Sequence, residues 1–281
     1  MKFQNSFATK ILILTLFGLT VIYPQNKSVK KFLKDLEPTI MYFENLKSKI
    51  SGMTKDRADA EYRKMLDERP SPWEITRETD KMTEKNVKEY KKQLPLIFTI
   101  NSEAPEGEPY FALSYDDKYI RSMLDPYLSD EMRNGLDLYE KEWPIFPDQL
   151  SLALNRYSGQ IKDLEDFIVS NKDCKISDLL KIRYNSMLYL FLAGSKEEDG
   201  TEWLFIWEGD NGDILSEAAR VEYEFFLEIC NNNGAFGKSF SCDLVRKYYQ
   251  ALKKNNFRRT EATDQILAPI NPTSEGEGGG N

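Results

Sequence analysis

The chain of 281 residues contains no histidine. Histidine is the side chain most often used to activate a serine or cysteine nucleophile, to transfer protons near neutral pH and to bind zinc. Its absence excludes Ser-His-Asp catalysis, Cys-His catalysis and histidine-ligated metal sites. Any catalysis by this chain would have to come from carboxylates, lysine, tyrosine, cysteine or a serine–lysine pair.

Cysteine is scarce as well, with three residues and no C-x-x-C spacing. The sequence therefore lacks the spacing typical of zinc knuckles and of thioredoxin-like redox sites. Cys230 and Cys242 flank an expected turn between two helices and are the candidate disulfide pair, which would leave Cys174 as a free thiol. Three buried thiols are the alternative, because closeness in sequence does not fix the distance between two cysteines.

Long uncharged apolar runs are missing except for one at the N-terminus. Ile11 to Tyr23 follows Lys2 and Lys10, and it is shorter than the roughly 20 residues that a bilayer span needs. This arrangement is typical of a secretory signal peptide. We therefore expect residues 1–25 to be a signal peptide, the protein to be secreted or periplasmic, and no membrane span to remain after cleavage. An uncleaved anchor and a buried N-terminal helix are the alternatives.

Acidic residues outnumber basic ones, 46 to 38, which makes the net charge −8. The expected signal peptide carries lysines but no acid, so its removal makes the chain more acidic still. A net-acidic protein has no general electrostatic attraction for nucleic acid or for anionic lipid. We therefore expect neither nucleic acid nor anionic lipid as a primary partner.

Apolar residues recur at helical spacing along most of the chain, which predicts a mainly α fold, of the α or α+β class. Short β segments are expected around residues 95–115, where PLIFTI and YFALSY can pair as a hairpin, and around 202–208. The predicted organisation is an N-terminal helical region at 26–93, a main helical domain at 94–258 and a disordered C-terminal tail at 259–281.

The densest apolar content after the N-terminal run lies between residues 177 and 230. Periodicity predicts two amphipathic helices there, 178–193 and 214–230, with Asp213 as the N-cap of the second. An acidic turn and a short strand join them. We expect the two helices to pack together through apolar stripes that include Leu188, Phe191, Phe226 and Ile229.

Three aromatic residues alternate with two aliphatic and two acidic ones in EWLFIWE, a part of the segment that joins these helices. Paired carboxylates hydrolyse glycosidic bonds, and indole rings stack on sugars. Glu202 and Glu208 are therefore candidate catalytic residues, and Trp203 and Trp207 are candidate ligand-binding residues. The competing interpretation is that the two tryptophans fill the hydrophobic core.

Two further patterns are candidates for binding sites. Asp210 and Asp213 offer oxygen ligands to a hard cation, although the spacing of an EF-hand is not met. GAFGKS at 234–239 resembles part of a phosphate-binding loop, but Asn232 occupies the position of its first glycine and the segment follows a predicted helix instead of a strand. We expect that segment to connect two helices, and we expect no cofactor.

These patterns favour an exported, non-catalytic binding or interaction protein whose partner is a protein or a carbohydrate. A carboxylate-dependent hydrolase acting on carbohydrate is the alternative. The exposure of the tryptophans separates the two functions. A sugar hydrolase needs them in an open cleft beside two carboxyl groups, whereas the binding protein buries them.

Overall fold

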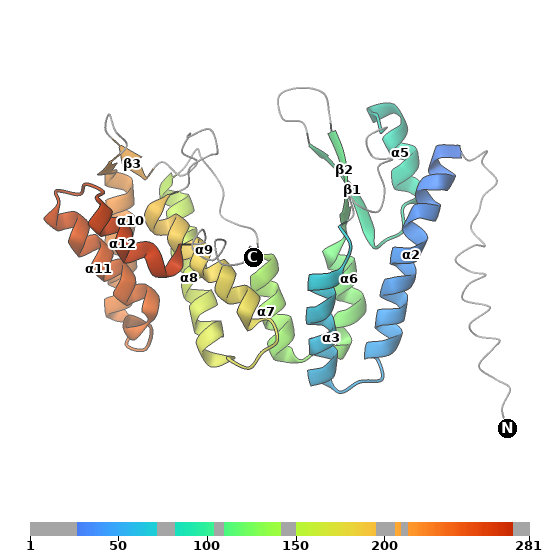
Figure 1. Ribbon diagram of the computed structural model, residues 1–281, viewed down its shortest axis with the longest axis horizontal. Coiled ribbons are helices and arrows are strands. Elements are labelled where there is room, and N and C mark those ends of the chain that lie inside the picture. The colour runs from blue at the N-terminus through green and yellow to red at the C-terminus, as the bar shows by residue number, and fades with distance from the viewer. Residues whose placement is uncertain are drawn as a thin grey trace, which may run out of the picture. The chain divides into compact units, whose positions relative to one another are not determined.

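The computed structural model describes residues 27–71, 82–103, 110–141, 150–194, 206–208 and 213–271. Two compact units divide the chain, Met1–Tyr127 and Leu128–Asn281, and helices dominate both (Figure 1). The predicted mainly α fold is confirmed, because the described residues contain only two short antiparallel sheets. None of the helices in the described ranges is both long and apolar enough to cross a bilayer. The expected signal peptide lies outside the described residues.

The first unit is built on one long helix, against which two further helices and a β-hairpin pack. Its elements in chain order are α2 (Lys27–Ile50), α3 (Lys55–Glu68), α5 (Glu84–Gln93), β1 (Phe98–Glu103), β2 (Tyr110–Tyr115), α6 (Asp117–Leu124) and the 3-10 turn η2 (Asp125–Tyr127). Helix α2 continues through Pro38, although a proline inside a helix removes one backbone hydrogen bond. Its buried stripe, which includes Val29, Phe32, Leu36 and Phe43, has the helical period that the sequence shows.

Strands β1 and β2 form the predicted hairpin, with Phe98 opposite Tyr115 and Ile100 opposite Leu113. Tyr115 stacks on Phe98 with ring centroids 5.4 Å apart and meets the edge of Phe43 in α2 at 5.5 Å. Its hydroxyl donates a 2.8 Å hydrogen bond to the carbonyl of Pro70. The hairpin therefore belongs to the core of the first unit.

This packing explains why the units divide at residues 127 and 128 instead of at the expected 93 and 94. The aromatic face of β2 is buried against α2, and Arg69 after α3 pairs with Asp117 of α6 at 2.6 Å. Arg69 also lies over the ring of Tyr115, 5.1 Å from its centroid. The pattern of apolar residues changes from helical to strand-like spacing after residue 93. It does not show on which helices the strands pack.

The second unit is a helical bundle with one two-stranded sheet of minimal length. Its elements are α7 (Asp130–Glu140), α8 (Leu150–Ser170), α9 (Ser177–Ala193), β3 (Trp207–Glu208), β4 (Ile214–Leu215), α10 (Glu217–Asn232), η3 (Phe236–Lys238), α11 (Phe240–Lys254), α12 (Glu261–Leu267) and η4 (Ala268–Ile270). Ser129 caps α7 by accepting a 3.0 Å hydrogen bond from the N–H of Met132.

Helices α9 and α10 meet as predicted, through aromatic rings. Phe191 lies 5.1 Å from Tyr223 and 5.4 Å from Phe226, measured between ring centroids. The principal neighbour of both helices is nevertheless α8, which packs along α9 and also contacts α10. Leu188 and Phe226 are fully buried, whereas Ile229 is only half-buried. Helix α8 completes this core, although it lies outside residues 177–230, the segment with the densest apolar content.

The chain does not lose its structure at residue 259, where the sequence predicts the start of a tail. Residues 261–267 form α12, whose N-terminus is closed by a capping box between Thr260 and Thr263. Leu267 and Ile270 are buried. The segment is ordered because these two apolar side chains add to the core of the second unit. Residues 272–281, the rest of the expected tail, lie outside the described residues.

Candidate functional site

Trp207, a candidate sugar-stacking residue, is part of the core. Only 4% of its surface is exposed, and its indole N–H donates a 2.9 Å hydrogen bond to the carbonyl of Ala193 at the end of α9. The guanidinium of Arg259 lies 5.6 Å from the ring centroid, within the range of a cation–π contact. The ring of Trp207 thus contacts Arg259 and its N–H group is hydrogen-bonded, both inside the protein.

Glu208, the neighbour of Trp207 in β3, points the other way and is exposed. The two residues alternate because successive side chains of a strand lie on opposite faces. A glycosidase needs its aromatic platform and its carboxyl groups in one cleft, and β3 separates them. Glu202 and Trp203, the other candidates of this set, lie outside the described residues.

Asp213 neither caps a helix nor stands free to bind a cation. Its Oδ2 accepts a 2.6 Å hydrogen bond from the guanidinium of Arg258, and its backbone carbonyl accepts one of 2.7 Å from the N–H of Arg259. Helix α10 begins later, where Ser216 accepts a hydrogen bond from the N–H of Ala219. Asp210 lies outside the described residues, and within the described ranges no cluster of acids and cysteines is suited to hold a metal ion.

The segment that follows α11 has a role that no sequence pattern indicates. Asn256 and Phe257 have φ values of 53° and 60°, a conformation that is unusual for side chains other than glycine and asparagine. The ring of Phe257 lies under the guanidinium of Arg220 at 4.1 Å, and its carbonyl accepts a 2.8 Å hydrogen bond from the N–H of Leu215 in β4. These contacts hold the two residues in the left-handed region, and the resulting turn directs the next two arginines at β3 and β4.

The side chain of Arg259 ties the segment to Trp207 and to α12. Besides its contact with Trp207, it donates a 2.7 Å hydrogen bond to Asp264 of α12. Burial alone would lower the pKa of Arg259, but the hydrogen bond to Asp264 and the nearby Tyr248 and Tyr189 raise it. Its charge therefore persists at any ordinary pH. An arginine inside a segment of weak apolar pattern gives no sequence signal for such a role.

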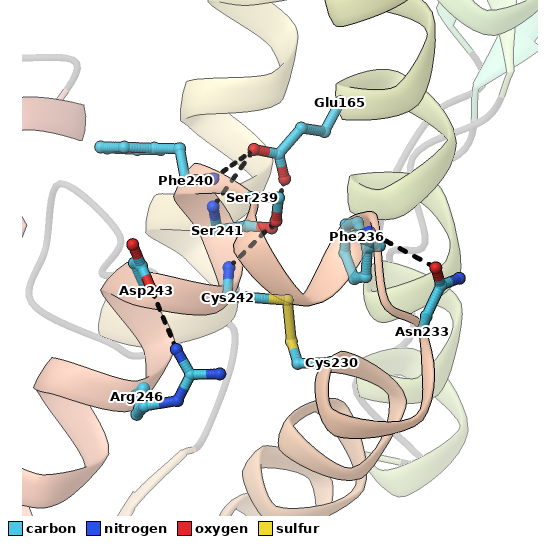
Figure 2. The surroundings of a disulfide bond; sticks show 10 residues. All are labelled: Glu165, Cys230, Asn233, Phe236, Ser239, Phe240, Ser241, Cys242, Asp243 and Arg246. Carbon is cyan, nitrogen blue, oxygen red and sulfur yellow. Dashed lines mark hydrogen bonds and ion pairs between the residues drawn. A yellow bond between two sulfur atoms is a disulfide. The ribbon is translucent and has the colours of Figure 1, made fainter.

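Cys230 and Cys242, the candidate disulfide pair, are joined in the structure with their Cα atoms 5.8 Å apart. The bond links the end of α10 to the first turn of α11 (Figure 2), and both cysteines are buried. Cys174 is half-buried and takes no part in a disulfide. Between the two bonded cysteines, GAFGKS forms η3 and is the expected connector. Gly237 is required there because a Cβ atom would lie 2.2 Å from the carbonyl oxygen of Cys230.

A buried carboxylate lies beside the disulfide. Glu165 of α8 reaches the N-terminus of α11, where one oxygen accepts hydrogen bonds from the N–H groups of Phe240 at 2.8 Å and Ser241 at 3.3 Å (Figure 2). Its other oxygen accepts a hydrogen bond from the hydroxyl of Ser241. The negative charge lies where unpaired N–H groups and the helix dipole favour an anion.

This arrangement of serine and carboxylate is not a nucleophile and its base. Ser241 has no exposed surface, so no substrate reaches its hydroxyl. Tyr184 nearby is buried too, and burial together with the charge of Glu165 raises the pKa of its hydroxyl far above neutral pH. The cluster fixes α8 against α11 and is structural.

We find no match of this chain to a protein family, to a curated protein or to a solved structure. Of the candidate residues that the structure describes, Trp207, Asp213, Cys230 and Cys242 hold the second unit together, and Glu208 is a surface residue.

Proposed function

We propose that the protein is an exported, non-catalytic binding protein whose partner is a protein or a carbohydrate. The burial of Trp207 is the observation that carries the non-catalytic part. A hydrolase would use this ring in an open cleft, whereas here its N–H group and its ring serve the fold. The absence of histidine from the whole chain supports the same conclusion.

Export rests on two independent features. The first is the charged start followed by the apolar run from Ile11 to Tyr23. The second is the pair Cys230 and Cys242, whose disulfide geometry favours an oxidising compartment, since cytosolic thiols are kept reduced.

The test of export is expression in a bacterial host, followed by fractionation and N-terminal sequencing. We expect the protein outside the cytoplasm with a new N-terminus between Val21 and Ser28. Peptide mapping without reductant should recover Cys230 linked to Cys242. An intact Met1 on cytosolic protein with both thiols reduced would contradict export.

The test of the non-catalytic function is a hydrolysis assay against a panel of polysaccharides and peptides. We expect no turnover, and in particular none that a chelator abolishes and zinc restores. Turnover of a polysaccharide that Glu208→Gln abolishes and Glu217→Gln leaves intact would overturn the proposal. Glu217 is a suitable control because it is likewise an exposed acid of the second unit.

A further inference from the structure

The connector between α10 and η3 contains an asparagine followed by a glycine. The side-chain carbonyl of an asparagine can be attacked by the backbone nitrogen of the next residue, and glycine obstructs this attack least because it has no side chain. The chain contains three such pairs: Asn134–Gly135, Asn211–Gly212 and Asn233–Gly234. Asn211–Gly212 lies outside the described residues. The structure distinguishes the other two pairs.

Gly234 offers an open nucleophile. It is exposed, and a Cβ atom built on it would meet no heavy atom within 4 Å beyond its chain neighbours. Asn233 is the residue at which α10 ends, with an extended ψ of 99°. Within the described ranges, the N–H of Gly234 donates to no backbone carbonyl. The attacking nitrogen is therefore accessible, and no backbone hydrogen bond of its own has to break first.

The carbonyl under attack is polarised by a donor. Oδ1 of Asn233 accepts a 3.3 Å hydrogen bond from the N–H of Phe236 (Figure 2). Attack at Cγ moves negative charge onto this oxygen, and an N–H placed at a developing oxyanion stabilises it. Nδ2, the leaving group, points away from Phe236 in the same view. The connector thus supplies a nucleophile and a stabilised electrophile in adjacent residues.

A backbone rotation brings the two groups together. The nitrogen of Gly234 meets Cγ only after rotation about the Cα–C bond of Asn233. This rotation breaks the 2.6 Å hydrogen bond that the carbonyl of Asn233 accepts from the N–H of Gly237. Loss of one such hydrogen bond slows the attack by about fivefold. The residues that must move with it, Gly234 and Ala235, are exposed.

Asn134–Gly135 is the same dipeptide in a closed setting. It lies inside α7, where each N–H donates to the carbonyl four residues earlier. Gly135 is buried, and a Cβ atom there would lie 2.5 Å from Ile176 and 2.9 Å from Phe167. The rotation would unwind the helix against these side chains. Asn134 is more exposed than Asn233, so exposure alone would rank the two pairs the other way.

We propose that Asn233 is a site of spontaneous deamidation through a cyclic imide with Gly234. The nitrogen of Gly234 bonds to Cγ and loses its proton to solvent hydroxide. The Cγ–Nδ2 bond breaks, and the amide nitrogen takes a proton from water and leaves as ammonia. Water then opens the imide, at Cγ to give aspartate or at the backbone carbonyl to give isoaspartate. The net reaction consumes one water, releases one ammonia and oxidises nothing.

Either product changes the junction of α10 and α11. A carboxylate replaces an amide at the C-terminus of α10, where the helix dipole disfavours negative charge. Isoaspartate also lengthens the main chain by one methylene between Cys230 and Cys242, whose disulfide keeps the two helices linked. The reaction needs only water and therefore depends neither on export nor on the partner of the proposed function.

The experiment is incubation of the purified full chain in mildly alkaline buffer, followed by reduction, digestion at mildly acidic pH and mass spectrometry. Trypsin separates the two sites into residues 221–238 and residues 134–141. We expect the first peptide to gain the mass difference between NH2 and OH and to contain isoaspartate at position 233. In water labelled with heavy oxygen, that peptide should take up one labelled atom.

The reference is the same chain reduced and unfolded in urea, where both pairs lose their structural setting and should react at similar rates. In the folded protein, we expect Asn233 to react within about tenfold of its unfolded rate. Asn134 should react at least about 100-fold more slowly than when unfolded, because its attack requires opening of a packed helix. Equal rates at the two sites of the folded protein would overturn the proposal, and so would protection of Asn233 as strong as that of Asn134.

Gly234→Ala tests the cyclic route. The site has room for the added Cβ atom, so we expect this variant to fold, and circular dichroism checks it. The methyl group obstructs the attacking nitrogen and should slow the reaction at Asn233 severalfold, while Asn134 in the unfolded chain reacts as in the parent. Formation of aspartate alone at an unchanged rate would overturn the proposal, because it would show direct hydrolysis of the side chain without the imide.

Discussion

The indole N–H of Trp207 donates a hydrogen bond to the carbonyl of Ala193, the last residue of α9. Carbonyl groups in the last turn of a helix have no partner within the helix. A side chain fourteen residues further along the chain supplies one here and at the same time closes the core beside Arg259. Trp207, a candidate sugar-binding residue in the sequence, thus provides the hydrogen-bond donor for the last carbonyl of a helix.

Trp207→Phe removes this hydrogen bond and retains an aromatic ring. We expect the free energy of unfolding to fall by about 1–3 kcal/mol, the cost of leaving a buried carbonyl without a donor. Urea denaturation followed by far-ultraviolet circular dichroism measures it. The control is Glu208→Ala, an exposed neighbour whose change should stay within about 0.5 kcal/mol. Equal stability of parent and Trp207→Phe would contradict the structural role.

Glu165→Ala removes the acceptor of three hydrogen bonds at the N-terminus of α11. We expect a loss of about 2–4 kcal/mol, because buried N–H groups lose their partner. Ser241→Ala should cost less, about 1 kcal/mol, since both backbone donors keep theirs. Asp163→Ala on the exposed side of α8 breaks only a surface ion pair with Lys141 and should change stability by less than about 1 kcal/mol. If Asp163→Ala lowers the free energy of unfolding more than Glu165→Ala does, the contact between Glu165 and α11 is unimportant for stability.

Leu188→Ala and Phe226→Ala each leave a cavity in the core of the second unit. We expect each to lower the free energy of unfolding by about 2–5 kcal/mol, a large part of the 5–15 kcal/mol typical of a folded protein. Ile182→Ala is the matched control on α9, because Ile182 is apolar but 57% exposed. If Ile182→Ala proves as costly as Leu188→Ala in chemical denaturation, the buried face of α9 has been misassigned.

Glu222 of α10 is buried, its Oε2 has no hydrogen-bond partner, and burial raises its pKa. A carboxyl group whose pKa is raised on folding binds its proton more tightly in the folded state. Stability is therefore lost as the pH rises from the ordinary pKa of about 4.3 through the raised value. We expect Glu222→Gln to stabilise the protein at pH 7, by roughly 1 kcal/mol, and to have little effect below about pH 4.

Thermal melts of parent and Glu222→Gln across this pH range test the expectation. Glu228→Gln, on the exposed face of the same helix, controls for the change in net charge and should not alter the pH dependence. A stability gain from Glu222→Gln that is the same at pH 4 and pH 7 would show that the carboxyl group does not titrate in this way.

The sequence by itself determined the mainly helical fold, the buried side of α2 and the presence of the hairpin. The period of 3.6 residues places Val29, Phe32 and Leu36 on one face of α2. The period of two predicts a hairpin from PLIFTI and YFALSY, and the structure forms it between Phe98–Glu103 and Tyr110–Tyr115. These features depend on residues close along the chain, so local patterns reveal them. The absence of histidine excludes whole classes of catalysis whatever the fold, and the spacing of Cys230 and Cys242 across one turn suggested the pair that the structure joins.

Only the tertiary structure decided what each buried face meets. Trp207 reads the same in the sequence whether its ring fills a core or lines a cleft, because its partners, Ala193 and Arg259, lie 14 and 52 residues away. Asp213 likewise pairs with an arginine 45 residues further on. The segment after residue 258 reads as a tail because its few apolar residues gain their burial from other helices. Contacts between distant residues depend on how the chain packs, which a local pattern does not record.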